Sequence, residues 1–274
     1  MEQPEKVGEK VALAEEQPEK VAEKVALAKE ETEDVGPGCG GRRRESVCVN
    51  EYVCKIEKVC AKTLTKGNKD MLLHDKLKSY NVILASASPR RRELLRATGI
   101  EYRLASKFEC DEEYPASLAA EDVAPYLSQL KSHAYPTPLA YNDLLITADT
   151  VVVLEGHVLG KPHNEEEAYA MIAALAGKEH CVVTGVTLRT PEREHTFAAR
   201  STVRFTTLSD EQIRYYVDNY RPMDKAGAYG IQEWIGYVGI ESIEGSFYNV
   251  MGLPVQRLCR ELEAFIEALP SCYM

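Results

Sequence analysis

From residue 80 onward, short hydrophobic runs alternate with amphipathic segments, a pattern typical of strands that alternate with helices. The first run, NVILASA at residues 81–87, is continuous and apolar, which predicts a buried strand. The further predicted strands lie at residues 100–105, 143–148, 151–154, 181–188, 201–205 and 237–243. The predicted helices lie at residues 88–98, 119–135, 164–175, 209–217 and 254–269. This alternation indicates an α/β fold.

Local signals mark the starts of three of these helices. Ser88 followed by Pro89 is a typical N-cap and first helical residue. Asn164 with Glu167, and Ser209 with Gln212, have the spacing of capping boxes, in which each side chain binds the other residue's backbone N–H.

The first part of the chain has a different character. Residues 2–15 (EQPEKVGEKVALAE) and 16–29 (EQPEKVAEKVALAK) are near-identical repeats with few, small apolar residues, and a proline interrupts each copy. We therefore predict that residues 1–41 form a charged, disordered tail, although a partner-binding arm is an alternative. Residues 42–79 are predicted to be a linker of uncertain structure, and residues 80–274 the folded domain.

Composition narrows the class of protein. The 274 residues carry 33 Lys and Arg against 43 Asp and Glu, a formal net charge of −10. This acidity argues against a generic nucleic-acid or anionic-membrane binder. No apolar run approaches the ~18 residues that a membrane span requires. The chain shows no secretory signal, and its eight cysteines lack CxxC spacing, so we expect free thiols and a cytoplasmic location.

The turn from the first strand into the first helix is the first candidate for chemistry. It reads SASPRRR at residues 86–92, which includes Ser86, Ser88, Arg90 and Arg91. Free N–H groups at a helix start and the bidentate donors of arginine both suit phosphate oxygens, so we predict a phosphate cradle. The alternative is an ordinary N-cap followed by a solvated basic face.

Polar residues later in the chain extend this picture. Asp149, which is followed by Thr150, comes at the expected end of a buried strand. Burying a carboxylate there is costly unless it binds Mg²⁺ or orients a water. The alternative is that Asp149 forms an Asx turn. Lys161 lies in a rigid Gly-Lys-Pro loop. The segment DKAGAYGIQ at residues 224–232 combines Lys225, small residues and Gln232, whose amide can read a base edge.

An acidic loop adds one more option. Glu109, Asp111, Glu112 and Glu113 are able to share a hard cation with Asp149, although a solvated acidic loop is the commoner explanation. The sequence lacks HExxH, GxSxG and P-loop motifs, which argues against a zinc protease, an acyl hydrolase and a P-loop NTPase. The remaining side chains suit divalent-metal phosphate chemistry.

The segments LASASPRR, ADTVV, GKP, DKAGAYGIQ and GSFYNVMGLP occur in this order. With them, residues 80–268 resemble the Maf (septum-formation) family of nucleoside triphosphate pyrophosphatases. The resemblance implies an elongated, ITPase-like mixed β-sheet with flanking helices and two lobes around a cleft. It also implies hydrolysis of a nucleoside triphosphate to the monophosphate and pyrophosphate with Mg²⁺ or Mn²⁺, and frequent homodimers.

The resemblance assigns roles to individual residues. It makes Asp149 the general base or a metal ligand, and Glu112 the second metal ligand, with Asp111 and Glu113 as alternatives in register. The substrate-binding set is Ser86, Ser88, Arg90, Arg91, Lys131, Thr150, Lys161, Lys225 and Gln232. Lys131 is followed here by serine, where the family usually has alanine.

The resemblance also indicates a subclass. The dTTP/UTP type has S-P-R, A-D-T and G-I-Q, as seen here at Arg90, Thr150 and Gln232, whereas the 7-methyl-GTP type has S-P-W and S-D-Q. Gln232 would then pair with the O4 and N3–H edge of uracil or thymine, in an enzyme that cleans nucleotide pools. The alternatives are a pyrophosphatase for other non-canonical nucleotides such as 7-methyl-GTP, and a non-catalytic nucleotide-binding regulator of cell division.

Overall fold

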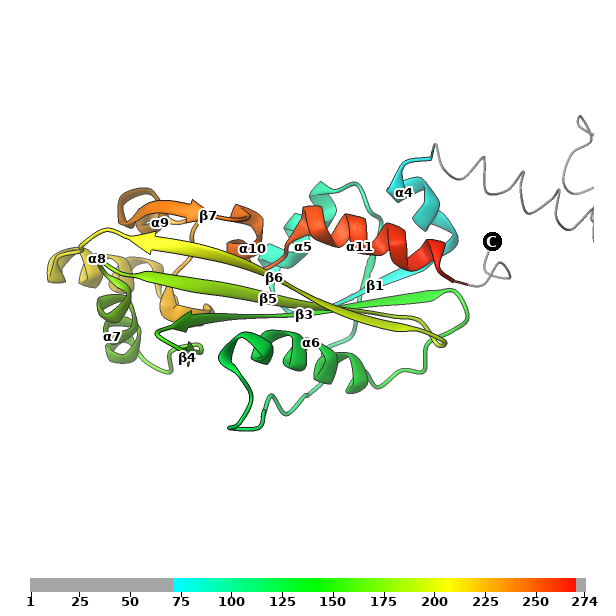
Figure 1. The fold of residues 1–274 in the computed structure, drawn as a ribbon, viewed down its shortest axis with the longest axis horizontal. Coiled ribbons are helices and arrows are strands. Elements are labelled where there is room, and N and C mark those ends of the chain that lie inside the picture. Colours follow the sequence, from blue (N-terminus) through cyan, green and yellow to red (C-terminus); the bar gives the residue numbers. More distant parts are fainter. Residues whose placement is uncertain (1–70, 270–274) are drawn as a thin grey trace, which may run out of the picture. The chain divides into compact units, whose positions relative to one another are not determined.

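A computed structural model describes residues 71–269 of the chain, and these residues are coloured in Figure 1. They form a mixed sheet in the order β2-β1-β3-β5-β6-β7, with β4 paired to β3. β1 runs parallel to β2 and β3, and the other pairs are antiparallel. The strands are β1 (Asn81–Ala85), β2 (Arg103–Leu104), β3 (Asp143–Leu154), β4 (His157–Leu159), β5 (Glu179–Arg189), β6 (Glu194–Phe205) and β7 (Ile240–Glu244).

Helices cover both faces of this sheet (Figure 1). The α-helices are α4 (Leu73–Lys76), α5 (Pro89–Ala97), α6 (Val123–His133), α7 (Glu165–Leu175), α8 (Asp210–Tyr220), α9 (Trp234–Gly239), α10 (Phe247–Met251) and α11 (Val255–Glu267). Short 3-10 turns are η1 (Leu77–Ser79), η2 (Ala120–Asp122) and η3 (Ala226–Ala228). The capping box of α8 is confirmed. In α7, Asn164 caps the helix, but the Glu167 carboxylate accepts from the backbone of His163 instead.

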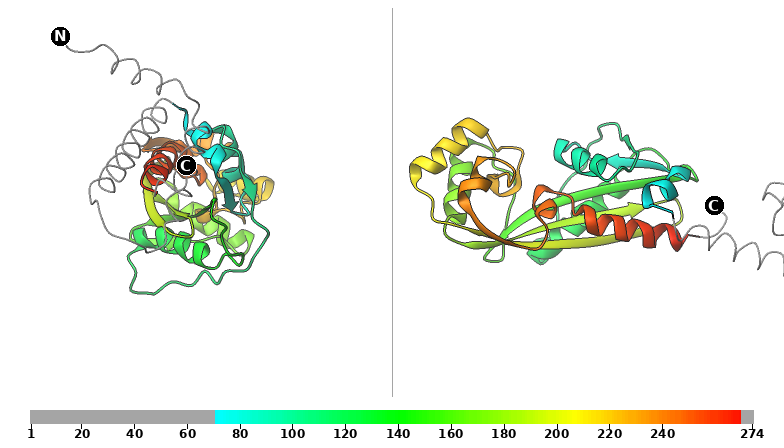
Figure 2. Two further views of the ribbon diagram at one scale, coloured as in Figure 1. Left: turned by 90° about the vertical axis from the view of Figure 1, so that its right-hand side faces the viewer. Right: turned by 90° about the horizontal axis from the view of Figure 1, so that it is seen from above.

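The core divides into clusters along the long strands β3, β5 and β6, which connect the two ends of the folded unit (Figure 2). One cluster joins α5 and α11 to β1 and β3, and includes Leu95 and Leu258. A second joins α7 and α8 to the other ends of β3, β5 and β6, and includes Ile172 and Tyr216. The expected α/β fold with two lobes on a mixed sheet is confirmed.

The structure corrects the prediction of two strands separated at Asp149 and Thr150. β3 is a single strand of 12 residues, in which Asp149 pairs with Gly185 and Thr150 with Thr184 of β5. Both polar side chains find partners in the tertiary structure, so the strand continues through them. Asp149 therefore lies within the strand and not at its carboxyl end.

The strand predicted at residues 237–243 is also partly wrong. Helix α9 extends to Gly239, and β7 begins only at Ile240. A glycine makes this short helix fit, because a Cβ at Gly236 would lie 1.8 Å from the carbonyl oxygen of Ile231. The predicted strand at 100–105 shrinks to the two residues of β2, whereas β6 begins well before residue 201.

An interruption in the pairing of β3 creates the setting for a site. β1 pairs with β3 from Asp143 to Thr147, and β4 pairs with the same edge from Val152 onward. Within the described residues, no strand covers residues 148–151 of β3 on that side. Successive side chains of a strand point to opposite faces, so Asp149 and Thr150 flank this gap from the two faces of the sheet.

Helix α6 lies unusually close to β5 behind the gap. A Cβ on Gly185 would lie 2.3 Å from the backbone nitrogen of Pro125 and 2.4 Å from the carbonyl carbon of Ala124. Thr147 donates to the Ser128 carbonyl (2.7 Å), which ties the same helix to β3. Glycine at this position therefore sets the depth at which α6 packs.

Residues 71–79 precede the predicted start of the domain at residue 80 and pack on it. Lys76 forms ion pairs with Glu263 (2.6 Å) and Glu267 (3.2 Å) of α11, and Leu77 belongs to the core. The tail repeat and most of the predicted linker lie outside the described residues, so the domain boundaries stay predictions. Between residues 71 and 269, no helix combines the length and apolar character needed to cross a membrane.

We expect Gly185→Ala to lower the free energy of unfolding by about 1–3 kcal/mol, because the new methyl group would meet the backbone of α6. Urea unfolding followed by circular dichroism measures this. Gly160→Ala is the matched control, since a Cβ there has no neighbour within 4 Å. Equal stability of the two variants would contradict the close packing of α6.

Candidate active site

A pocket of about 1030 Å³ opens at the gap beside β3. Its wall comes from the turn between β1 and α5, residues 104–112, the middle of β3, residues 224–232 and the end of α10. All of the residues predicted for the site line it, namely Ser86, Ser88, Arg90, Arg91, Glu112, Lys131, Asp149, Thr150, Lys161, Lys225 and Gln232. The structure thus brings together residues that are widely spaced in the sequence, while their individual roles stay predictions.

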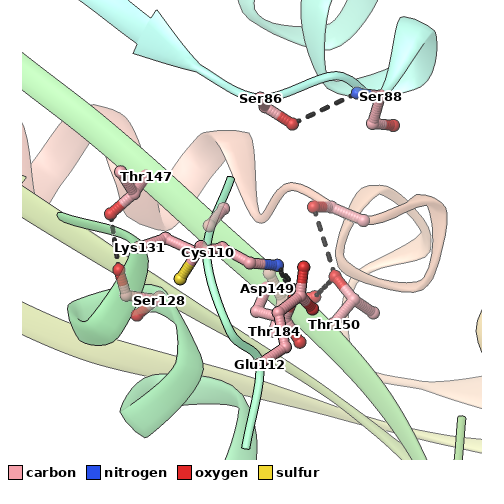
Figure 3. A network of polar contacts seen from close by, with 12 residues as sticks. Ser86, Ser88, Cys110, Glu112, Ser128, Lys131, Thr147, Asp149, Thr150 and Thr184 are labelled. Carbon is pink, nitrogen blue, oxygen red and sulfur yellow. Dashed lines mark hydrogen bonds and ion pairs between the residues drawn. The ribbon is translucent and has the colours of Figure 1, made fainter. Parts of the chain in front are cut away.

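Three charged side chains of the pocket, Lys131, Asp149 and Glu112, form a compact cluster (Figure 3). The ammonium of Lys131, from α6, lies 2.5 Å from Oδ1 of Asp149 and 3.0 Å from Oε2 of Glu112. Asp149 is only 8% exposed, so the ammonium offsets much of the cost of burying its carboxylate. Of the adjacent acids at 111–113, Glu112 is the one whose carboxylate contacts Lys131.

These two carboxylates suit a hard divalent cation. They converge on a single positive charge, which shows that a cation is already favourable between them. Mg²⁺ is usually held by one or two carboxylates together with water and substrate phosphates. Among residues 71–269, no group of three His, Cys, Asp or Glu side chains forms a complete metal site. Asp149 and Glu112 fit the part of a Mg²⁺ site that a protein commonly supplies, because this ion takes further ligands from water and phosphate.

The two arginines of the predicted phosphate cradle differ in their surroundings. NH1 of Arg90 lies 3.0 Å from a carboxylate oxygen of Asp224, on the opposite wall of the pocket. Arg91 instead donates to neutral oxygens of the protein: the carbonyls of Gly252 and Ala148, both at 2.8 Å, and the hydroxyl of Thr150 at 2.9 Å. Burial lowers the pKa of Arg91.

Arg91 is part of a polar network that crosses the sheet. The Thr150 hydroxyl also lies 2.9 Å from that of Thr184, which donates to the carbonyl of Asn249 at 3.1 Å. Asn249 is fully buried on α10. Asn249 is not among the site residues predicted from the sequence, although the segment GSFYNVMGLP contains it. The network thus connects α5, β3, β5 and α10 around the pocket.

The start of α5 differs from the ordinary N-cap that was the alternative to a phosphate cradle. Pro89 is the first helical residue, as predicted, but the Ser88 side chain makes no capping hydrogen bond. The backbone N–H of Ser88 donates instead to Oγ of Ser86, at 3.3 Å. The Ser88 hydroxyl is therefore not committed to the helix start, which is consistent with a ligand-facing role.

Lys225 and Gln232 form the opposite wall. The ammonium of Lys225 lies 2.7 Å from Asp224 and 3.1 Å from Glu233, so two carboxylates balance its charge. Burial alone would raise the pKa of Asp224, but Lys225 and Arg90 outweigh it and hold this pKa below its usual value. Oε1 of Gln232 is buried and has no hydrogen-bond partner among the described residues. A buried acceptor without a donor is unfavourable, and Gln232 lines the pocket, so a bound ligand is one source of that donor.

We expect Arg91→Lys to lower the free energy of unfolding by about 2 kcal/mol. The planar guanidinium donates to three oxygens at once, and a lysine ammonium cannot reach all three. Arg96→Lys, an exposed position on the same helix, is the control and should change stability by less than about 0.5 kcal/mol. Thermal unfolding measures both. An Arg91 variant as stable as its control would show that the network contributes nothing to the fold.

Comparison with known proteins adds to this geometry. The Maf-like protein family model matches residues 81–265. A protein of Bacteroides thetaiotaomicron named dTTP/UTP pyrophosphatase is 54% identical over 187 residues, which cover 68% of this chain and 97% of that protein. Proteins with the same name from Parabacteroides distasonis and from Porphyromonas gingivalis W83 are each 50% identical, over 70% and 71% of this chain and 99% and 98% of their own.

A solved structure of a HAM1 protein from Coxiella burnetii aligns with 68% of this chain and 99% of its own. The identity is 13% and the TM-score is 0.35, a value that does not establish a common fold. The family match and the sequence relatives do not depend on this alignment. Because the family model matches residues 81–265 and the relatives are about 50% identical over two thirds of the chain, this chain belongs to the Maf-like protein family.

Proposed function

We propose that this protein is a nucleoside triphosphate pyrophosphatase that hydrolyses dTTP and UTP to the monophosphate and pyrophosphate, and so cleans the nucleotide pool. One observation carries the proposal: Asp149, Lys131 and Glu112 form a charged cluster in the same pocket as Arg90 and Lys161. Membership of the Maf-like family and the name of the bacterial relatives support it.

In this proposal the pocket has a phosphate side, whose residues act on the triphosphate, and a base side, where Gln232 contacts the nucleotide base. Arg90 and Lys161 bind the β- and γ-phosphates, and their positive charge stabilises the departing pyrophosphate. A water attacks the α-phosphorus as the bond between that phosphorus and the bridging oxygen breaks. Asp149, held in place by Lys131, accepts the proton of this water or holds the metal ion, and both roles require its ionised carboxylate.

Asp149 and Glu112 are the residues that would hold Mg²⁺ or Mn²⁺. When bound, such an ion neutralises phosphate charge and lowers the pKa of a bound water. Lys131 contacts both carboxylates, so its ammonium contributes positive charge at the same place. This arrangement keeps the two acids together before a nucleotide arrives.

Gln232 provides the base preference in this proposal. Its unpaired Oε1 accepts a hydrogen bond from N3–H of uracil or thymine, and its amide nitrogen donates to O4. A 7-methyl-GTP preference would need a different set of donors on this wall. The non-catalytic alternative would require loss of a charged group from the pocket, but Asp149, Lys161 and Arg90 are all present.

We also propose a cytoplasmic location and a homodimer. Cys110, Cys181 and Cys259 are free thiols within the described residues, which suits a reducing compartment, and the other cysteines lie outside that part of the chain. The homodimer is proposed only from the family resemblance.

The test of this function is a nucleotide panel with Mg²⁺, in which dTTP, UTP, CTP, 7-methyl-GTP and ITP are incubated with the enzyme and the products are separated by ion exchange. We expect monophosphate and pyrophosphate from dTTP and UTP. Asp149→Asn should lower the rate by about 10²–10⁴-fold, because the carboxylate that acts on the water or the metal is lost.

Asp218→Asn is the matched control, because Asp218 is exposed on α8 and does not line the pocket. It should keep wild-type activity. Turnover of 7-methyl-GTP but not of dTTP or UTP would contradict the base preference. Absence of turnover with every nucleotide would favour the non-catalytic regulator.

A further inference from the structure

Tyr216 is a fully buried tyrosine in the middle of α8, and it does not line the pocket. Its hydroxyl makes two hydrogen bonds. It accepts from the backbone N–H of Gly230 at 3.0 Å, and it donates to Oε2 of Glu233. A single hydroxyl therefore contacts both ends of the segment 230–233, and Gln232 lies between the two contacts.

This segment is a tight turn, in which the N–H of Glu233 donates to the carbonyl of Gly230 at 3.0 Å. The Glu233 side chain folds back over the turn, since a Cβ on Gly230 would lie 2.8 Å from its carboxyl carbon. The turn and the tyrosine are thus fitted to each other.

The charges around the hydroxyl define the direction of these bonds. Burial of the ring and, to a smaller extent, the hydrogen bond to Glu233 raise the pKa of Tyr216. The hydroxyl therefore stays protonated and donates to the carboxylate. The other oxygen of Glu233, Oε1, lies 3.1 Å from the ammonium of Lys225. Lys225 contacts Asp224 at 2.7 Å, and Asp224 contacts Arg90 at 3.0 Å. The same carboxylate therefore connects the base side of the pocket to the phosphate side.

We propose that Tyr216 is a positioning residue for base recognition, whose hydroxyl holds the turn at residues 230–233 so that the Gln232 amide faces the pyrimidine edge. This inference rests on the proposed function and adds a residue that does not touch the nucleotide. Without the hydroxyl, the Gly230 N–H and the Glu233 carboxylate would both lose a buried partner, and the turn would relax toward other conformations. The Asp149–Lys131 pair, on β3 and α6, would keep its geometry.

The experiment compares UTP with N3-methyl-UTP, in which a methyl group replaces the hydrogen that N3 donates to Oε1 of Gln232. We expect the wild-type protein to prefer UTP strongly in kcat/KM, because a buried acceptor is left unpaired with the methylated base. In Tyr216→Phe, the ratio of the two kcat/KM values should fall by on the order of tenfold. Partial unfolding cannot produce this result, because it lowers the activity on both substrates equally.

Tyr215→Phe is the matched control: Tyr215 is the adjacent residue of α8, 48% exposed, and should keep the wild-type ratio. If Tyr216→Phe does not fold, Glu233→Gln replaces it; its neutral amide weakens the bond from the Tyr216 hydroxyl, and the ratio should fall severalfold. An unchanged ratio in a folded, active Tyr216→Phe or Glu233→Gln protein would overturn the inference alone. A wild-type protein that does not hydrolyse UTP would overturn the proposed function and the inference together.

Discussion

The pocket is built around an unpaired edge of β3, which lies between the pairing of this strand with β1 and its pairing with β4. When both edges of a strand are paired, a ligand cannot approach the strand along an edge. Here residues 148–151 are paired on one side only, so both faces of the strand open into one pocket. Asp149 on one face faces α6, and Thr150 on the other faces α5 and α10. One strand thus places the Asp149 carboxylate beside α6 and the Thr150 hydroxyl beside α5 and α10.

The charges of the pocket follow from the packing around this edge. Gly185, opposite Asp149 on β5, allows α6 to approach closely, and that approach places Lys131 between Asp149 and Glu112. The ammonium lies between the two carboxylates and contacts both of them. On the opposite wall, Asp224 contacts both Arg90 and Lys225, and Lys225 also contacts Glu233, so positive and negative groups alternate there. Such a site is suited to a ligand with several negative charges and bound cations.

The sequence predicted much of this fold because periodicity and helix-start signals are local. The strand at β1, the helices α7 and α8 and the capping box at Ser209 are all set by neighbouring residues. β3 was predicted to break at Asp149 and Thr150 because their polarity suggests a turn. The partners that keep them in a strand, Lys131 and Thr184, lie 18 and 34 positions away. The site residues were found through motifs, whereas Tyr216 belongs to no motif and acts through contacts with the distant segment 230–233.

In the proposed function, this pocket directs water to the α-phosphorus of a pyrimidine nucleoside triphosphate. The most direct measurement is hydrolysis of dTTP in ¹⁸O-labelled water, with the position of the label determined by mass spectrometry of the separated products. We expect a single ¹⁸O in dTMP and none in pyrophosphate, because the bond between the α-phosphorus and the bridging oxygen is the one that breaks. Label in pyrophosphate, or stepwise release of labelled phosphate, would contradict it.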